Sequence, residues 1–262
     1  RYLSMSADSK AFPDFCFGTG VFSGAYNAIT EANAYAAVER ALERGVRMFD
    51  TAPYYGRSEV ILGEALRRVA GRFPREHYLL STKIGRYGPK RVDFDYSASR
   101  VRDSVAESCR RLGVDKLDIV FCHDVEFVDA SQVLDEALPV LFSLKDRGII
   151  DRVGISGYPL DTLLDLARKQ AERGRPLDIV LSYCHYTLQN TLLDAYIPRF
   201  HAAGISRIIN ASPLCMGLFR DGDPPEWHPA SEELRQATRR ASILCREAGL
   251  SIADVALRFS LQ

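Results

Sequence analysis

Four side chains that can take part in proton transfer follow predicted strands in the first half of the chain. Asp50 ends the apolar run in RMFDTAPYYG, and Tyr55 lies five residues later, across a turn that contains proline and glycine. Burying an aspartate there costs several kcal/mol unless a cation or hydrogen-bond donors meet it. Lys83 in YLLSTKIG and His123 in KLDIVFCHD lie near the ends of the next two strands. This pattern indicates a proton-transfer site.

The chemistry of such a site centres on the tyrosine. A tyrosine with a pKa of about 10 is a poor acid or base at neutral pH, and a neighbouring ammonium lowers that pKa. We expect Asp50 to keep Lys83 charged and aimed, and His123 to hydrogen-bond a substrate oxygen. Together the four can move a proton at a carbonyl or alcohol oxygen while a hydride moves at the carbon. Each of the four side chains could also have an ordinary structural role. Their equivalent places in consecutive strand-helix units favour a catalytic role instead.

Apolar strand-like runs alternate with amphipathic segments along the whole chain. Strands are predicted at 15–20, 47–51, 78–84, 117–123, 152–156, 178–184 and 207–211, and helices at 31–44, 58–70, 97–112, 130–147, 160–173, 191–203, 232–248 and 252–261. This alternation predicts an α/β fold with a parallel sheet and right-handed crossovers. No GxGxxG follows any strand, which favours a (β/α)8 TIM barrel over a doubly wound sheet.

The eighth βα unit of that barrel is missing from the sequence, which ends at SLQ. An open seam would expose two strand edges, so we expect the full protein to be longer. We predict one barrel domain over residues 1–262, incomplete at its C-terminal end. Catalytic groups of such barrels lie at the C-terminal ends of the strands, where the four candidate residues fall.

Composition narrows the possible functions. The 262 residues carry no net charge, so nothing favours binding to nucleic acid or an anionic membrane. No apolar run approaches the length of about 18 residues that a membrane span needs, and no signal peptide is visible. The six cysteines show no CxxC spacing and are interpreted as reduced, mostly buried thiols of a cytoplasmic protein. The five histidines show no metal-ligand spacing, so no metal site is predicted, and no heptad or apolar stripe indicates an oligomeric state.

Two Cys-His pairs raise the alternative of a nucleophilic thiol. Cys122 precedes His123, and Cys184 precedes His185. Adjacent residues of a strand point to opposite faces, so neither pair can form a dyad by itself.

Two further places near strand ends invite a functional interpretation. Trp227 and His228 lie in the loop after the seventh strand, as a substrate lid or as a packed loop. Ser156 and Gly157 end the fifth strand, where small residues allow close approach of a flat ring or amide, or form a plain turn.

The sequence resembles the aldo-keto reductases. GTG, FDTAPYYG, SEVILGEAL, STKIGRYG, RVRDSVAESCRRLGVDKLDIVFCHD, VGISGYPL and ASPLCMGL carry the resemblance across essentially the whole chain. In that family the matching tetrad is Asp, Tyr, Lys and His, here Asp50, Tyr55, Lys83 and His123. The resemblance implies a nicotinamide cofactor that lies extended across the barrel mouth without a Rossmann domain.

A narrower resemblance concerns the substrate. GRY, CHDVEF, LSYCHYTLQNTLLD, INASPLCMGL and PPEWHPAS are similar to the sugar dehydrogenases of this family, the plant L-galactose and fungal NAD-linked D-arabinose dehydrogenases. These enzymes oxidise the anomeric carbon of an aldose to an aldonolactone, on the route to ascorbate or erythroascorbate. The resemblance implies a sugar substrate of the D-arabinose, L-galactose or L-fucose type, and NAD as cofactor, with NADP possible.

The resemblance also assigns binding residues. Substrate contacts fall on Tyr55, His123, Trp227 and His228, and cofactor contacts fall on Gly20, Asp50, Ser156, Gly157, Ser182, Ser212, Leu214 and Gly217. Two positions depart from the family pattern. Gly157 stands where many members have the asparagine of a Ser-Asn pair, and Ala211 stands where many have an aromatic residue that stacks on the nicotinamide.

Three other activities stay open at this point. A general NADPH-dependent aldehyde or ketone reductase shares the tetrad. A Schiff-base aldolase would use Lys83 as its nucleophile. A non-catalytic regulatory subunit, such as a channel-associated one, would bind the cofactor without turnover. The sugar-dehydrogenase motifs favour the aldose 1-dehydrogenase.

Overall fold

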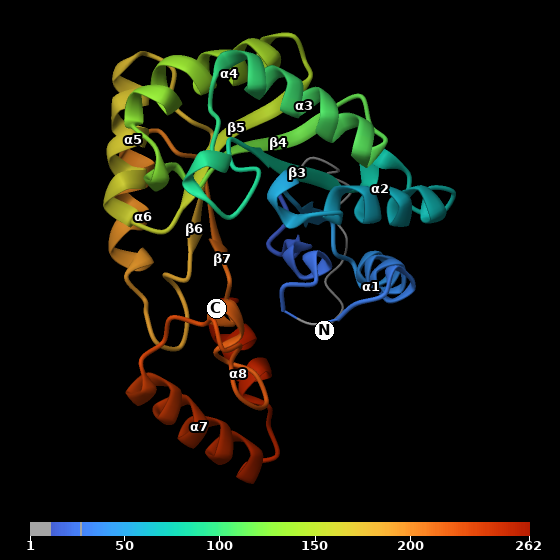
Figure 1. Ribbon diagram of the computed structural model, residues 1–262, viewed down its shortest axis with the longest axis vertical. Helices are drawn as coiled ribbons and strands as arrows, with labels where there is room; N and C mark the ends of the chain where they lie inside the picture. The colour runs from blue at the N-terminus through green and yellow to red at the C-terminus, as the bar shows by residue number, and fades with distance from the viewer. Residues whose placement is uncertain (1–11, 27) are drawn as a thin grey trace. The chain divides into compact units, whose positions relative to one another are not determined.

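Seven strands and eight α-helices alternate along the part of the chain that the computed structural model describes, residues 12–26 and 28–262 (Figure 1). The strands are β1 Phe17–Gly18, β2 Met48–Asp50, β3 Leu79–Ile84, β4 Leu117–His123, β5 Ile150–Gly157, β6 Ile179–Tyr183 and β7 Arg207–Ala211. The helices are α1 Glu31–Glu43, α2 Ser58–Val69, α3 Ala98–Leu112, α4 Leu138–Asp146, α5 Leu160–Glu172, α6 Leu193–Ala202, α7 Glu232–Glu247 and α8 Ile252–Ser260.

The strands follow one another in chain order, β1 to β7, within one sheet. The paired registers run parallel, for example Asp50 opposite Ser81 and Lys83 opposite Phe121. Every residue of β4 is buried, as is usual for a parallel strand that is covered on both faces. The predicted α/β class with a parallel sheet is confirmed.

Helix ends follow local chemistry. The Thr30 hydroxyl accepts a hydrogen bond from the Asn33 amide at the start of α1, and the Ser231 hydroxyl accepts one from the Leu234 amide at the start of α7. Gly113 ends α3 in the left-handed region, with φ of 71°. Most predicted boundaries are therefore correct to within one or two residues.

The segment predicted as one helix over 130–147 is different. Gln132–Ala137 forms a π-helix, which continues into α4, and the Leu138 amide bonds to the Val133 carbonyl five residues back. Pro139 has no amide hydrogen, and its ring crowds the carbonyl four residues earlier. A wider turn before the proline relieves that crowding. The helix predicted over 130–147 is therefore present, with a π-helical segment that the sequence did not indicate.

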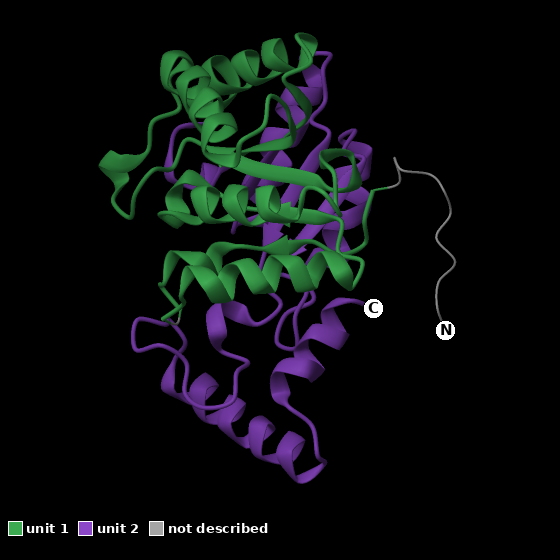
Figure 2. Cartoon of the chain, turned by 90° about the vertical axis from the view of Figure 1, so that its right-hand side faces the viewer, with its two compact units in different colours: residues 1–122, 131–153 green, residues 123–130, 154–262 purple. Residues whose placement is uncertain are grey.

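The chain forms two compact units (Figure 2). The first comprises the residues up to Cys122 together with Ser131–Val153, and the second comprises His123–Ala130 and Gly154–Gln262. The predicted single barrel domain over 1–262 stays a prediction. In the second unit, α7 and α8 are tied to the chain after β7 by an apolar cluster, whose buried members are Cys184, Cys215, Leu218, Phe219, Ile252 and Ala256.

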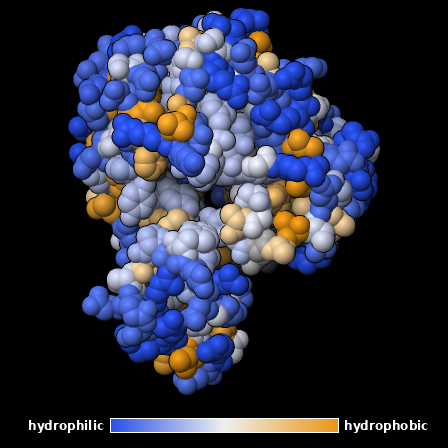
Figure 3. Space-filling view, viewed as in Figure 1, coloured by the Kyte–Doolittle hydropathy of each residue, from blue (hydrophilic) through white to orange (hydrophobic). Residues whose placement is uncertain are grey.

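Within the described residues, no helix is both long enough and apolar enough to cross a bilayer. The cysteines are free; Cys122, Cys184 and Cys215 are buried, whereas the other three are partly exposed. Burial of the thiols is therefore less general than the sequence predicted. Hydrophobic side chains on the face shown in Figure 3 are scattered among hydrophilic ones, which is normal for a folded chain.

Candidate active site

A buried ion pair lies at the C-terminal ends of β2 and β3. Lys83 Nζ lies 2.5 Å from Asp50 Oδ2 and donates a second hydrogen bond to the Thr51 carbonyl at 2.9 Å. The other carboxylate oxygen of Asp50 accepts a hydrogen bond from the Ser81 hydroxyl. Lys83 is only 2% exposed. The two buried charges therefore compensate each other as an ion pair, as the sequence predicted.

The surroundings of Lys83 keep it charged. Burial by itself lowers the pKa of this ammonium, but the negative charge of Asp50 raises it, as do the Tyr55 side chain and the hydrogen bonds to both groups. The net effect raises the pKa of Lys83 above its usual value. The positively charged form of Lys83 is therefore favoured at neutral pH.

Tyr55 lies beside this cation. It ends a short 3-10 turn, Pro53–Tyr55, directly after β2, and Lys83 Nζ lies 4.9 Å from the centre of its ring. A lasting ammonium next to a phenol favours the tyrosinate form. The structure thus brings together three of the four predicted catalytic side chains, Asp50, Tyr55 and Lys83, within the first unit.

Gly20 lies against the same tyrosine. A β-carbon placed on Gly20 would lie 3.8 Å from Cζ of Tyr55, which is ordinary contact distance. The glycine begins the 3-10 turn Gly20–Ser23, so the small residue leaves the edge of the tyrosine ring open on that side. The structure thus places Gly20 next to the Tyr55 ring, while its predicted cofactor contact stays a prediction.

A layer of hydroxyl groups fixes the loop ends around Asp50. The Thr19 amide and hydroxyl both donate to the Asp50 carbonyl at 2.8 Å. The Ser58 hydroxyl lies 2.7 Å from that of Thr19 and 3.0 Å from that of Thr51. All three hydroxyl-bearing residues are fully buried, so the network joins β1, β2 and the start of α2 into one support.

Glu59 supports the site from behind β3. Its carboxylate accepts a hydrogen bond from the Thr82 hydroxyl at 2.6 Å and one from Arg111 Nε at 2.6 Å. Glu59 is 1% exposed. The contact holds α2, β3 and α3 together on the side of the strand opposite Lys83, because neighbouring strand residues point to opposite faces.

His123, the fourth predicted catalytic residue, is the last residue of β4 and belongs to the second unit. It is buried, and its Nε2 lies 3.5 Å from Asp124 Oδ2. Asp124 adopts the left-handed conformation, with φ of 55°, which ends the strand abruptly. The structure confirms that His123 ends a strand; its role toward a substrate stays a prediction.

The end of β5 has a physical explanation that the sequence did not reveal. A β-carbon on Gly157 would overlap the Glu126 carboxylate, and the other oxygen of Glu126 accepts a hydrogen bond from the Tyr158 amide at 2.9 Å. Gly157 therefore makes room for Glu126. Ser156 beside it is buried, and the predicted cofactor contacts of both residues stay predictions.

The segment after β7 is a tight turn held by its own hydrogen bonds. Ser212, Cys215, Met216 and Gly217 all have positive φ, at 59°, 47°, 55° and 86°. The Ser212 hydroxyl accepts a hydrogen bond from the Met216 amide at 3.1 Å, and the Gly217 amide donates to the Leu214 carbonyl at 3.0 Å. The predicted cofactor contacts of Ser212, Leu214 and Gly217 stay predictions.

Ser182 occupies the end of β6. It is fully buried, and its hydroxyl lies 3.1 Å from His185 Nδ1. Burial lowers the pKa of His185, which favours the neutral ring. The neutral imidazole fixes the orientation of this serine, whose contact with a cofactor stays a prediction.

Trp227 and His228 differ in their surroundings. Trp227 is 53% exposed, whereas His228 is buried. His228 Nδ1 accepts a hydrogen bond from the Ala230 amide at 3.0 Å, and Nε2 lies 2.8 Å from the Cys215 carbonyl. Both ring nitrogens of His228 thus serve its own loop, and Trp227 is the better candidate of the two for contact with a substrate.

The thiols give no support to a nucleophilic cysteine. Burial raises the pKa of Cys122, and burial together with the charge of Asp50 raises that of Cys16. The hydrogen bond with Cys215, and then burial, raise the pKa of Cys184. The same hydrogen bond lowers the pKa of Cys215 to about 7, but that residue is 1% exposed and out of reach of a substrate.

Sequence reasoning found the charged groups of the site and missed the hydroxyl groups that position them. A signal for Ser81 was present, since it precedes Lys83 by two residues and must share its face of β3. The roles of Thr19, Ser58 and Glu126 depend on contacts between distant segments, which no local pattern shows.

Comparison with known proteins agrees with the geometry. The profile of the aldo/keto reductase family matches residues 14–262. L-Galactose dehydrogenase of Arabidopsis thaliana is 40% identical over 94% of this chain and 75% of its own length. D-Arabinose 1-dehydrogenase of Saccharomyces cerevisiae is 42% identical over 86% of this chain and 67% of its own length. D-threo-Aldose 1-dehydrogenase of a Pseudomonas species is 28% identical over 98% of this chain and 84% of its own.

A solved structure described as an aldo-keto reductase from Pseudomonas aeruginosa has the same fold. It superposes with a TM-score of 0.65 at 24% identity and covers 97% of this chain and 91% of its own. The fold and the family expected from the motifs are thereby confirmed. The chain belongs to the aldo/keto reductase family.

Proposed function

We propose that this protein is an NAD(P)-dependent aldose 1-dehydrogenase, which oxidises the anomeric hydroxyl of a cyclic aldose to an aldonolactone. The observation that carries the proposal is the buried Lys83, whose pKa is raised, held by Asp50 and placed beside the Tyr55 ring. Two relatives at or above 40% identity are named for the oxidation of L-galactose and D-arabinose. We therefore propose an aldose of the D-arabinose, L-galactose or L-fucose type as substrate, in the cytoplasm, on a route to ascorbate or erythroascorbate.

Members of this family use nicotinamide cofactors, and a nicotinamide supplies a hydride acceptor for C1 of the sugar. We propose NAD as the preferred form. On the family pattern, Ser212, Leu214 and Gly217 would contact the cofactor, and the hydrogen bonds within their turn hold its backbone in one conformation.

The protein's own side chains handle the proton. Tyr55, favoured as tyrosinate by Lys83, takes the proton from the C1 hydroxyl, which leaves electron density to expel the hydride. Asp50 and the Thr51 carbonyl fix the position of Lys83, so the cation does not leave the tyrosine. On the family pattern, His123 donates a hydrogen bond to a sugar oxygen and orients C1.

The test is the formation of reduced nicotinamide, followed by absorbance, with D-arabinose, L-galactose or L-fucose and either NAD or NADP. Tyr55→Phe should lower kcat by about 10²- to 10⁴-fold, the usual contribution of a general base, with cofactor affinity nearly unchanged. Tyr54→Phe is the matched control, because Tyr54 lies in the same turn but packs against Arg86, with 3.8 Å from the guanidinium to its ring centre.

Each outcome separates the alternatives. Wild-type turnover in Tyr55→Phe would refute the proposed role of Tyr55. Activity on simple aldehydes with NADPH, and none on any sugar, would favour a general reductase. Cofactor binding without turnover on either substrate class would favour a regulatory subunit.

A further inference from the structure

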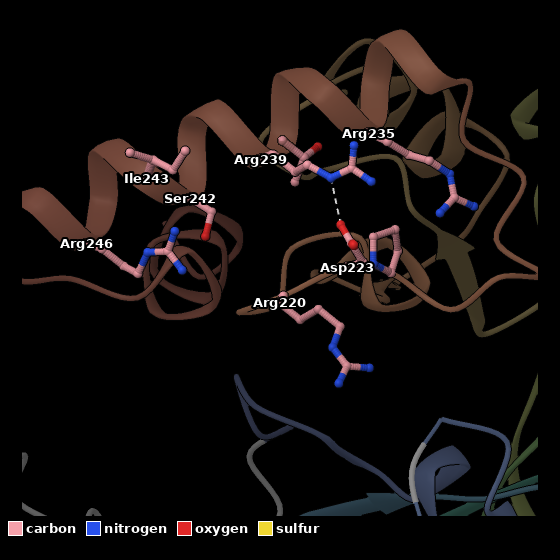
Figure 4. A pocket seen from close by; sticks show the side chains of 10 residues that line it. Arg220, Asp223, Arg235, Arg239, Ser242, Ile243 and Arg246 are labelled. Atoms are coloured by element: carbon pink, nitrogen blue, oxygen red, sulfur yellow. Dashed lines mark hydrogen bonds and ion pairs between the residues drawn. The ribbon is translucent and has the colours of Figure 1, made fainter.

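A polar hollow lies in the second unit between α7 and the loop that follows β7 (Figure 4). One face of α7 contributes residues at three- and four-residue spacing, and the loop contributes residues 220 and 222–224. The lining residues used below are Arg220, Asp223, Arg235, Arg239, Ser242 and Arg246. The hollow measures about 260 Å³, somewhat less than the roughly 300 to 1,000 Å³ of pockets for drug-sized ligands.

The hollow has an excess of positive charge. Four guanidinium groups and one carboxylate line it. Asp223 pairs with Arg239 at 2.7 Å, and Glu232 approaches the same arginine at 3.1 Å. Among the described residues, neither Arg220 nor Arg246 makes an ion pair. The positive charge of these two side chains is therefore not compensated by the chain.

Arg235 serves mainly to hold the loop. It donates to the His228 carbonyl at 2.6 Å and to the Ala230 carbonyl at 3.2 Å. Carbonyl groups fix a guanidinium without neutralising it, so this third positive charge also persists. The part of the wall formed by Arg235 is thus held in place by hydrogen bonds within the chain.

Ser242 provides an independent sign of a missing ligand. It is 6% exposed, and its hydroxyl makes no hydrogen bond with the described residues. Thr238, one turn earlier on the same face, instead donates to the Leu234 carbonyl at 2.9 Å. Figure 4 shows the Ser242 hydroxyl on the side of α7 that faces the loop. Buried hydroxyl groups nearly always have a partner.

We propose that this hollow is a binding site for a small oxyanion, a phosphate or carboxylate group carried by a molecule of about sugar size. Guanidinium groups match the geometry of both oxyanions through paired N–H donors, and Ser242 supplies a hydroxyl donor on the floor. The volume fits such a ligand better than a whole dinucleotide. The surface over α7 is mostly hydrophilic (Figure 3), in keeping with a charged ligand. The proposal does not depend on the dehydrogenase activity.

The test is isothermal titration calorimetry of the purified protein with inorganic phosphate, with sodium D-gluconate as the carboxylate arm and sodium chloride at equal ionic strength as the reference. Arg246→Ala should weaken binding about tenfold, and Ser242→Ala several-fold. Arg240→Ala is the matched control, because Arg240 is exposed on the same helix and does not line the hollow; it should bind like the wild type.

Thermal unfolding separates the effect of Ser242→Ala on stability from its effect on anion binding. Ser242→Ala removes an unpartnered hydroxyl, so its Tm without anion should equal or exceed that of the wild type, while the rise in Tm on adding the anion should shrink. Binding of phosphate alone, or of gluconate alone, shows whether the site takes a phosphate or a carboxylate group. Equal binding by wild type and both pocket variants, no preference over chloride, or displacement of phosphate by NADP in a one-to-one manner would overturn the proposal.

Discussion

Replacing Asp50 by asparagine isolates the charge that keeps Lys83 protonated. The substitution preserves the shape of the side chain but removes the carboxylate partner of the Lys83 ammonium, which is 2% exposed and keeps the Thr51 carbonyl at 2.9 Å as an acceptor. Breaking a buried ion pair in this way costs about 3 to 5 kcal/mol. An exposed pair of similar length is worth less than about 1 kcal/mol, and Lys116 with Asp151 at 2.6 Å is such a pair.

The pH dependence gives the sharper test. In the wild type the pKa of Lys83 is raised, so its contribution to stability is complete below the unfolded value of about 10.4 and is lost as the pH rises through the folded value. In Asp50→Asn burial dominates and lowers that pKa. Between the lowered value and about 10.4 the unfolded chain then binds more protons, so the stability of the variant rises with pH.

Urea denaturation at several pH values between 7 and 10 measures this difference. We expect Asp50→Asn to be about 3 to 5 kcal/mol less stable than the wild type at pH 7, with the gap narrowing as the pH approaches 10. Asp151→Asn should change stability by less than about 1 kcal/mol at every pH. A gap of equal size in the two variants, or a gap that does not depend on pH, would refute the reasoning about Lys83.

Three further predictions concern the supports of the site. In urea denaturation, Glu59→Gln should destabilise the protein by about 3 kcal/mol or more, because it breaks the ion pair of a buried carboxylate with Arg111. Glu107 approaches the same arginine at 3.5 Å from a partly exposed position, so Glu107→Gln should cost less than about 1 kcal/mol. Gly157→Ala should cost about 1 to 3 kcal/mol through overlap with Glu126, and the cost should largely vanish in a Glu126→Ala background; equal costs in both would contradict the assigned contact. His228→Ala should lower the Tm because it leaves backbone groups of its loop unpaired, whereas Trp227→Ala should raise the KM for the sugar at unchanged Tm.

The sequence predicted the elements well where a pattern is local. Short apolar runs indicated the strands, and Gly113 ended α3 where expected. The π-helix before Pro139 was missed because its wider turn depends on the proline's missing amide hydrogen and on packing, and the apolar spacing of that segment is equally compatible with an α-helix.

The charged members of the site were predictable for a related reason. A buried carboxylate or ammonium at the end of an apolar strand requires an oppositely charged or hydrogen-bonding partner. This requirement was enough to predict the pair Asp50 and Lys83. A serine or threonine does not require a distant charged partner, since its hydroxyl can form a hydrogen bond with the neighbouring backbone. Ser58 and Thr19 therefore look ordinary in the sequence, although their hydroxyl groups lie 2.7 Å apart in the structure across a separation of 39 residues.

The buried pair at the centre of the site is better explained by chemistry than by stability. Taking an aspartate and a lysine out of water costs several kcal/mol for each ion, and well-packed apolar residues often do as well or better for stability. What apolar residues cannot supply is a fixed positive charge 4.9 Å from the centre of the Tyr55 ring. The Asp50 carboxylate and the Thr51 carbonyl together hold that charge in place, and the Ser81 hydroxyl in turn holds Asp50. The pair therefore accounts for a fixed positive charge beside the Tyr55 phenol, which favours the tyrosinate form.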